Sequence, residues 1–149
     1  MYASAAMAFL HHLAAFTLVA ALAVEVALFK PPVTVVQARR LQRTDLIFGV
    51  VAVVVLVVGM LRVAFFEKGP AYYWRDTFFL IKLGTFVLVG LISIYPTKTF
   101  LSWKKALKAG VAPEVDAGRT RSVRMCMMLE LTGVLVIRGC AALMARGFG

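Results

Sequence analysis

The stretch from Leu46 to Leu61 reads LIFGVVAVVVLVVGML and contains no charged residue. With its flank, as residues 46–66, it is as long as the roughly 20 residues that cross the apolar core of a bilayer. Three further apolar stretches of similar length lie at about 5–28, 76–97 and 123–144. The sequence therefore predicts an all-α integral membrane protein with four transmembrane helices.

The composition of the whole chain agrees with this prediction. Of its 149 residues, 62% are hydrophobic and 16% are charged, and the mean hydropathy is +0.88. These values lie outside the range of ordinary soluble domains. The connections left between the stretches, 30–45 and 98–122, are too short to build a core of their own. We expect one membrane domain, 1–149, folded as an up-down-up-down bundle.

Positive charges are distributed unequally between the two ends of this bundle. The two longer connections carry Lys30, Arg39, Arg40, Arg43, Lys98, Lys104, Lys105, Lys108, Arg119 and Arg121, with Arg124 just beyond them, whereas the other end carries Lys68, Arg75 and Arg146. Because short basic loops stay in the cytoplasm, both termini are expected on the outer side. The net charge of +10 then sets the topology and attracts anionic lipid. Binding of nucleic acid is not expected, because the sequence predicts no soluble basic domain to present these charges.

Five ionisable residues lie within the outer half of the predicted spans: His11, His12, Arg62, Lys82 and Arg138. At ~1.5 Å per residue the histidines, the lysine and Arg138 lie ~9–10 Å deep, and Arg62 lies at ~6 Å. Ionisable groups inside a membrane are costly unless they are paired or used. We expect all five to converge on one pocket facing the bundle interior. The alternative is that the cations extend separately to lipid headgroups.

Such a pocket, with three cations and only Glu67 and Asp76 near its rim, needs a bound anion or a lysine that has lost its proton. Haem b meets both requirements. His11 or His12 and a neutral Lys82 are candidate iron ligands. Arg62 and Arg138 are candidate partners for the two propionates.

Glu25 and Glu130 form a smaller polar set nearer the inner side. One interpretation is a structural tie between the first and fourth helices, in which Arg121 or Arg124 pairs with these acids. The other is a proton path from Glu130 and Glu25 toward the outer pocket, since carboxylates inside membranes often serve as proton relays.

Three segments carry a resemblance to a known family. They are FLHHLAAFTLVAALAVE (Phe9 to Glu25), RVAFFEKGPAYYWRDTFFLIKLGTFVLVGLISIYPTKTFLSWKK (Arg62 to Lys105) and MARGFG (Met144 to Gly149). With them the chain resembles an uncharacterised bacterial family of predicted four-span inner-membrane proteins, a domain of unknown function. The resemblance implies the bacterial inner membrane. In that membrane, the orientation expected from the basic connections makes both termini periplasmic.

The chain is more distantly similar to HemJ-type protoporphyrinogen oxidases and CopD-like four-span proteins. In those proteins a histidine early in the first span and a lysine in the third are associated with haem. The matching positions here are His11 or His12, and Lys82 after Trp74 and Phe79. The chain departs from them in its doubled histidine, in Glu25 and in its Gly69-Pro70 outer loop.

Three functions are compatible with these features. The first is a membrane redox protein that binds haem b and transfers electrons. The second is a non-enzymatic subunit of a larger membrane complex with a lipid- or anion-binding outer pocket, and the third is a small anion or solute permease. Membrane lipids and a homo-oligomer or larger complex are the expected partners. Whether the protein is an enzyme is left open by the sequence.

The distribution of positive charge leads to a prediction about topology. In a cysteine-free background, single cysteines at residues 104–120 should react with an impermeant thiol reagent only from the cytoplasmic side. Labelling of these positions only from outside would overturn the orientation and the outer location of the five ionisable residues.

Overall fold

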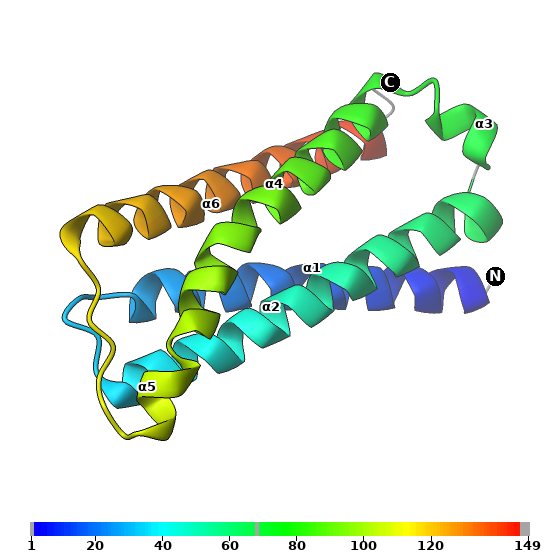
Figure 1. Cartoon of the computed structure of the whole chain (residues 1–149). Helices are drawn as coiled ribbons and strands as arrows, with labels where there is room; N and C mark the ends of the chain where they lie inside the picture. Colours follow the sequence, from blue (N-terminus) through cyan, green and yellow to red (C-terminus); the bar gives the residue numbers. More distant parts are fainter. Residues whose placement is uncertain (1, 68, 147–149) are drawn as a thin grey trace.

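The computed structural model describes residues 2–67 and 69–146, and the regular secondary structure of this part is all helical (Figure 1). The long helices are α1 (Tyr2–Leu28), α2 (Val35–Leu61), α4 (Thr77–Ser102) and α6 (Ala117–Ala145). A π-helical turn, η1 (Arg62–Phe66), continues α2, and two short helices, α3 (Pro70–Tyr73) and α5 (Lys104–Lys108), lie in the connections.

The four long helices have the length and composition of membrane-spanning segments. The shortest of them has 26 residues and is therefore ~39 Å long, which exceeds the ~30 Å apolar core of a bilayer. This confirms the prediction of an all-α protein with four helices that are long and apolar enough to cross a membrane.

The second helix begins earlier than predicted. The sequence placed a connection at 30–45, but α2 starts at Val35 and only residues 29–34 connect it to α1. Thr34 caps the helix: its hydroxyl accepts from the backbone N–H of Gln37, whose side chain accepts from the backbone N–H of Thr34. This reciprocal capping box stabilises a helix start. Polar residues as far as Thr44 are therefore helical.

The third helix ends later than predicted, because Pro96 does not stop it. Proline removes one backbone hydrogen bond, and here its ring is fully buried within a helix that runs on to Ser102. The connection predicted at 98–122 contains the short helix α5. The last helix begins before residue 123 because Asp116 caps it; the backbone N–H of Arg119 donates to Asp116 at 2.8 Å and holds the pKa of that carboxyl below its usual value.

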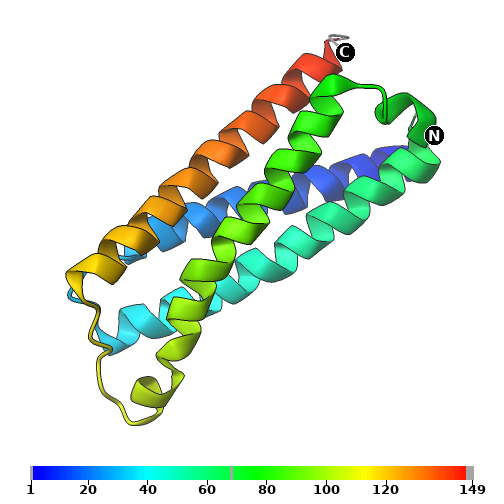
Figure 2. The same cartoon turned by 45° about the horizontal axis from the view of Figure 1, so that its top comes forward.

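The helices form two hairpins, α1 with α2 and α4 with α6, and helices pack most extensively within each hairpin. α4 lies beside α6 toward one end of the bundle and beside the first turns of α2 at the other (Figures 1 and 2). We call the end where α1 begins and α6 ends the terminal end, and the opposite end, with α5, the α5 end. The hairpins diverge toward the terminal end (Figure 1).

The buried apolar residues form two clusters at different levels of the bundle. The middle cluster consists of Leu18, Ala21, Leu22, Phe48 and Val134. The α5-end cluster consists of Phe29, Val33, Ala38, Leu41, Phe100, Trp103, Leu107, Val123 and Met127. Two side chains on α2 reinforce this end, because Gln42 donates to the carbonyl of Phe100 at 2.6 Å and Arg39 to that of Leu107 at 3.2 Å.

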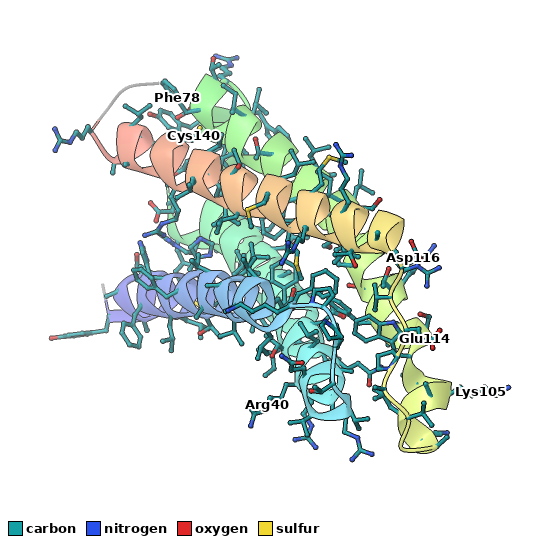
Figure 3. The ribbon with its side chains drawn as sticks, turned by 90° about the vertical axis from the view of Figure 1, so that its left-hand side faces the viewer. Arg40, Phe78, Lys105, Glu114, Asp116 and Cys140 are labelled. Carbon is teal, nitrogen blue, oxygen red and sulfur yellow. The ribbon has the colours of Figure 1, made fainter. Side chains whose placement is uncertain are left out.

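The outer surface of the bundle is apolar along the helices and charged at the α5 end. Large side chains such as Phe9, Leu46, Leu91 and Leu135 are more than half exposed. The labelled charged residues Arg40, Lys105, Glu114 and Asp116 gather toward the α5 end (Figure 3). This distribution is typical of helices whose sides face lipid and whose charged ends face water.

Close packing of α4 against α6 depends on Gly133. A Cβ atom at this position would collide with Cγ2 of Val89 and lie 3.6 Å from Cγ2 of Thr85. Small residues let membrane helices approach in this way. Gly133→Ala should therefore destabilise the detergent-solubilised protein by about 1–3 kcal/mol, as overpacking does. Gly139→Ala is the matched control on the same helix, since nothing lies within 4 Å of its Cβ position. Equal thermal midpoints for the two variants would contradict this packing.

Candidate functional site

A cavity of about 530 Å³ opens between the two hairpins toward the terminal end. All five ionisable residues that the sequence singled out line it: His11, His12, Arg62, Lys82 and Arg138. They come from three of the long helices, α1, α4 and α6, and from the π turn that continues α2. The structure therefore brings together the residues predicted to converge, and we call this cavity the terminal pocket.

The two histidines differ in their surroundings. The His12 side chain is exposed, and its Nδ1–H donates to the carbonyl of Ala8 in the same helix at 2.6 Å. His11 is partly buried and packs against α2, where a Cβ at Gly59 would lie 3.2 Å from its Cε1 atom. Its Nδ1 atom is buried with no hydrogen-bond partner among the described residues. His11 is thus the better candidate for binding a ligand.

Arg62 lies at the junction of α2 and the π turn, where its guanidinium forms an ion pair with Glu67. This is the one ion pair within residues 2–67 and 69–146. Its Nε atom is buried and has no partner in the same part of the chain. Arg62 therefore keeps hydrogen-bonding capacity on the pocket side although its charge is partly balanced.

Lys82 and Arg138 each lie over an aromatic ring, and neither forms an ion pair within the described residues. The ammonium of Lys82 lies 5.4 Å from the centre of the Phe79 ring, and the guanidinium carbon of Arg138 lies 5.1 Å from that of Phe16. Asp76 is buried in the pocket wall, but its carboxylate accepts from the backbone N–H of Phe79 at 3.0 Å and caps α4. Of the two pocket carboxylates, one pairs with Arg62 and the other caps a helix.

The charges of the pocket act together. Arg62, Lys82 and Arg138 all interact electrostatically with the His11 ring, and Lys82 also interacts with Arg62, Asp76 and Glu67. Counting three cations and two carboxylates, the lining has a net charge of +1 with both histidines neutral. The pocket is electropositive, as the sequence predicted, and attracts an anionic group.

Apolar and aromatic side chains complete the walls, among them Val55, Met60, Leu83, Phe86, Ile137 and Ala141. At the mouth, the rings of Tyr73 and Trp74 lie 5.1 Å and 6.1 Å from that of Phe79. Predominantly apolar walls with a few polar groups, in a volume of this size, are typical of small-molecule and cofactor sites. Tyr72 and Tyr73, in the connection between η1 and α4, therefore form part of the pocket wall.

The polar side chains of the terminal pocket suit a ligand that already contains a metal better than they suit a free metal ion. No group of three His, Cys, Asp or Glu side chains within the described residues is arranged to hold a metal ion. The pocket instead offers an imidazole, an amine and two guanidinium groups around an apolar space. An amphipathic anion such as a metalloporphyrin fits this set, since its ring needs apolar walls and its carboxylates need cations.

The inner polar set is larger than expected from the sequence. Glu25 and Glu130 are buried, and Asp45, which the sequence placed in a connection, is buried beside them on α2. Neither Arg121 nor Arg124 forms an ion pair with an acid in the part of the chain that the structure describes, so the expected structural tie is not formed. Both arginines are exposed and line a shallow groove near Pro31 and Pro32.

Gly59 is a pocket residue that the sequence analysis did not identify. Gly49 and Gly59 lie on the same helix, but nothing lies within 4 Å of a Cβ at Gly49, whereas the His11 ring packs on Gly59. Distinguishing them from sequence requires knowing which face of α2 meets α1. The signal available was the shared depth of Gly59 and His11.

Comparison with known proteins gives a family but no characterised relative. No curated protein and no solved structure matches the chain. The comparisons therefore give no support for a similarity to HemJ-type or CopD-like proteins. A family model described as "Predicted membrane protein (DUF2214)" matches residues 3–149. Because this match covers nearly the whole sequence, the chain belongs to the DUF2214 family of predicted membrane proteins.

Proposed function

We propose that the terminal pocket binds haem b and that the protein transfers electrons within the membrane. The observation that carries this proposal is the convergence of five ionisable side chains on one largely apolar cavity, in which His11 has a buried nitrogen without a partner. Leaving such groups unused inside a bilayer is costly. A bound amphipathic anion with a metal centre would use four of them, His11, Arg62, Lys82 and Arg138.

Each pocket residue has a distinct part in this proposal. His11, held against Gly59, supplies an imidazole, and Lys82 on the opposite hairpin supplies an amine. Arg62 and Arg138 hold the two carboxylates of the ligand, while the apolar walls exclude water. Haem b would supply one-electron exchange. The fixed positions of these side chains on four helices would hold the ring between the two hairpins.

The proposal extends to location and assembly. The excess of positive charge at the α5 end supports a bacterial inner-membrane protein with periplasmic termini. Large exposed apolar side chains along all four long helices support contact with lipid and with further copies or other subunits.

A second candidate function is a non-enzymatic subunit that binds lipid phosphate in the terminal pocket. The exposure of Arg138 favours it, because an exposed guanidinium near a helix end can reach a headgroup. The third possibility, an anion or solute permease, has less support. The middle apolar cluster lies between the terminal pocket and the α5 end, and a permease needs a polar passage there.

The absorption spectrum of the purified protein, before and after dithionite, separates these functions. The haem proposal requires a Soret band that shifts on reduction, in protein produced with sufficient haem precursor. A colourless protein under those conditions would contradict it, and phospholipid retained in that sample would favour the second function.

The two adjacent histidines provide a matched pair of variants. His11→Ala should abolish or strongly reduce the Soret band, because it removes the imidazole that faces the pocket. His12→Ala should keep the band, because the His12 ring is exposed and bonded to its own helix. The measurement is the ratio of Soret to protein absorbance. The reverse outcome, loss in His12→Ala alone, would contradict the ligand assignment.

Substitutions of Lys82 distinguish a side chain that ligates iron from one that only attracts an anion. If its amine ligates iron, Lys82→Met should change or abolish the Soret band and Lys82→Arg should not restore the native spectrum, since guanidinium does not act as a ligand. If the ammonium only attracts an anion, arginine should substitute well. A native spectrum in Lys82→Met would show that Lys82 is not a ligand.

A further inference from the structure

A second polar layer lies nearer the α5 end and contains one group from each long helix. It consists of Glu25 on α1, Asp45 on α2, Thr97 on α4 and Glu130 on α6. The three carboxyl residues are only 2%, 8% and 1% exposed, respectively. The hydroxyl of Thr97 donates to Asp45 at 2.7 Å and links α4 to α2. We call these four residues the acid layer.

Two of the carboxyl groups have an oxygen with nothing to bond. One oxygen of Glu25 and one of Glu130 are buried without a hydrogen-bond partner among the described residues. Each of the two acids interacts electrostatically with Asp45, and Glu25 also interacts with Glu130. The unpartnered oxygens therefore belong to groups close enough to repel one another when ionised.

Among the described residues, no cation forms an ion pair with the acid layer. The basic residues nearest to it along its helices, Arg43, Lys98 and Arg124, are exposed, and in the part of the chain that the structure describes none forms an ion pair with these acids. The other titratable group that senses Glu130 is the thiol of Cys126, one turn away on α6. Three ionised carboxylates in this setting would each cost several kcal/mol.

Apolar side chains close the acid layer from both sides. Leu22, Phe48 and Val134 of the middle cluster lie about one turn along their helices toward the terminal end. Phe29, Leu41 and Met127 of the α5-end cluster lie about one turn in the other direction. Whatever balances the acids is therefore held inside the bundle.

We propose that the acid layer is a proton-binding site whose protons are shared among Glu25, Glu130 and Asp45. A protonated carboxyl group is neutral and becomes a hydrogen-bond donor, so it can satisfy the unpartnered oxygen of a neighbouring acid. A proton suits the site better than a metal ion, because no three acidic, histidine or cysteine side chains within the described residues are placed to hold one.

The site also joins the two hairpins, which gives it a consequence for the fold. Glu25 and Asp45 belong to the α1/α2 hairpin, and Thr97 and Glu130 to the α4/α6 hairpin. Protonation allows hydrogen bonds across this contact, whereas loss of the protons places like charges on both sides of it. The middle apolar cluster lies between the acid layer and the terminal pocket.

Infrared spectroscopy of the full-length, detergent-solubilised protein at neutral pH tests the proposal directly. The wild type should show the carbonyl band of protonated carboxylic acids. Glu25→Gln and Glu130→Gln should each reduce it, and the double variant should abolish most of it. Glu114→Gln is the control, because Glu114 is exposed in the connection before α6 and should leave the band unchanged. Absence of the band in the wild type, or an unchanged band in the double variant, would overturn the proposal.

The pH dependence of stability gives a second readout that does not depend on haem. A native state that binds more protons than the unfolded chain loses stability as pH rises. The thermal midpoint of the wild type should fall from neutral to alkaline pH, and that of the Glu25→Gln/Glu130→Gln variant should fall less. The same slope in both proteins would contradict proton binding by these acids.

Discussion

An ionisable side chain inside a bilayer must be paired, reach water or hold something, because the apolar medium does not stabilise its charge. In this chain that constraint acts at two levels of one four-helix bundle. Toward the terminal end, cations and a histidine face a cavity of about 530 Å³. Toward the α5 end, three carboxyl groups meet in a closed space. The apolar cluster around Leu22 and Phe48 separates the two layers.

The hairpin arrangement explains why these layers can exist. Tight packing within each hairpin, as at Gly133 and Val89, leaves the polar groups to meet between the hairpins. The hairpins diverge toward the terminal end, so the cationic layer surrounds a cavity, while they stay close at the α5 end, where the acid layer is closed (Figure 1). The same pair of hairpins can therefore hold a large ligand at one level and protons at another.

Much of this arrangement could be predicted from the sequence, because helix length and residue depth depend on local spacing. The four spans and the convergence of His11, Lys82 and Arg138 followed from counting residues along apolar stretches. Asp45 was missed because the Thr34–Gln37 capping box was overlooked and the residue was placed in a connection.

Other features depend on contacts between helices that spacing does not reveal. His11 is a better ligand candidate than His12 because its ring packs on Gly59 of the neighbouring helix. Spacing likewise does not show that Arg121 and Arg124 are exposed and form no ion pair with Glu25 or Glu130 among the described residues.

The central claim is that the terminal pocket holds haem b and not a lipid or a simple anion. Native mass spectrometry of the protein released from detergent measures this directly, since it weighs whatever remains bound to the chain. The account predicts a mass increment of one haem b per chain, present in the wild type and lost when His11 is replaced by alanine. A bare chain, or an increment that matches phospholipid alone, would contradict it.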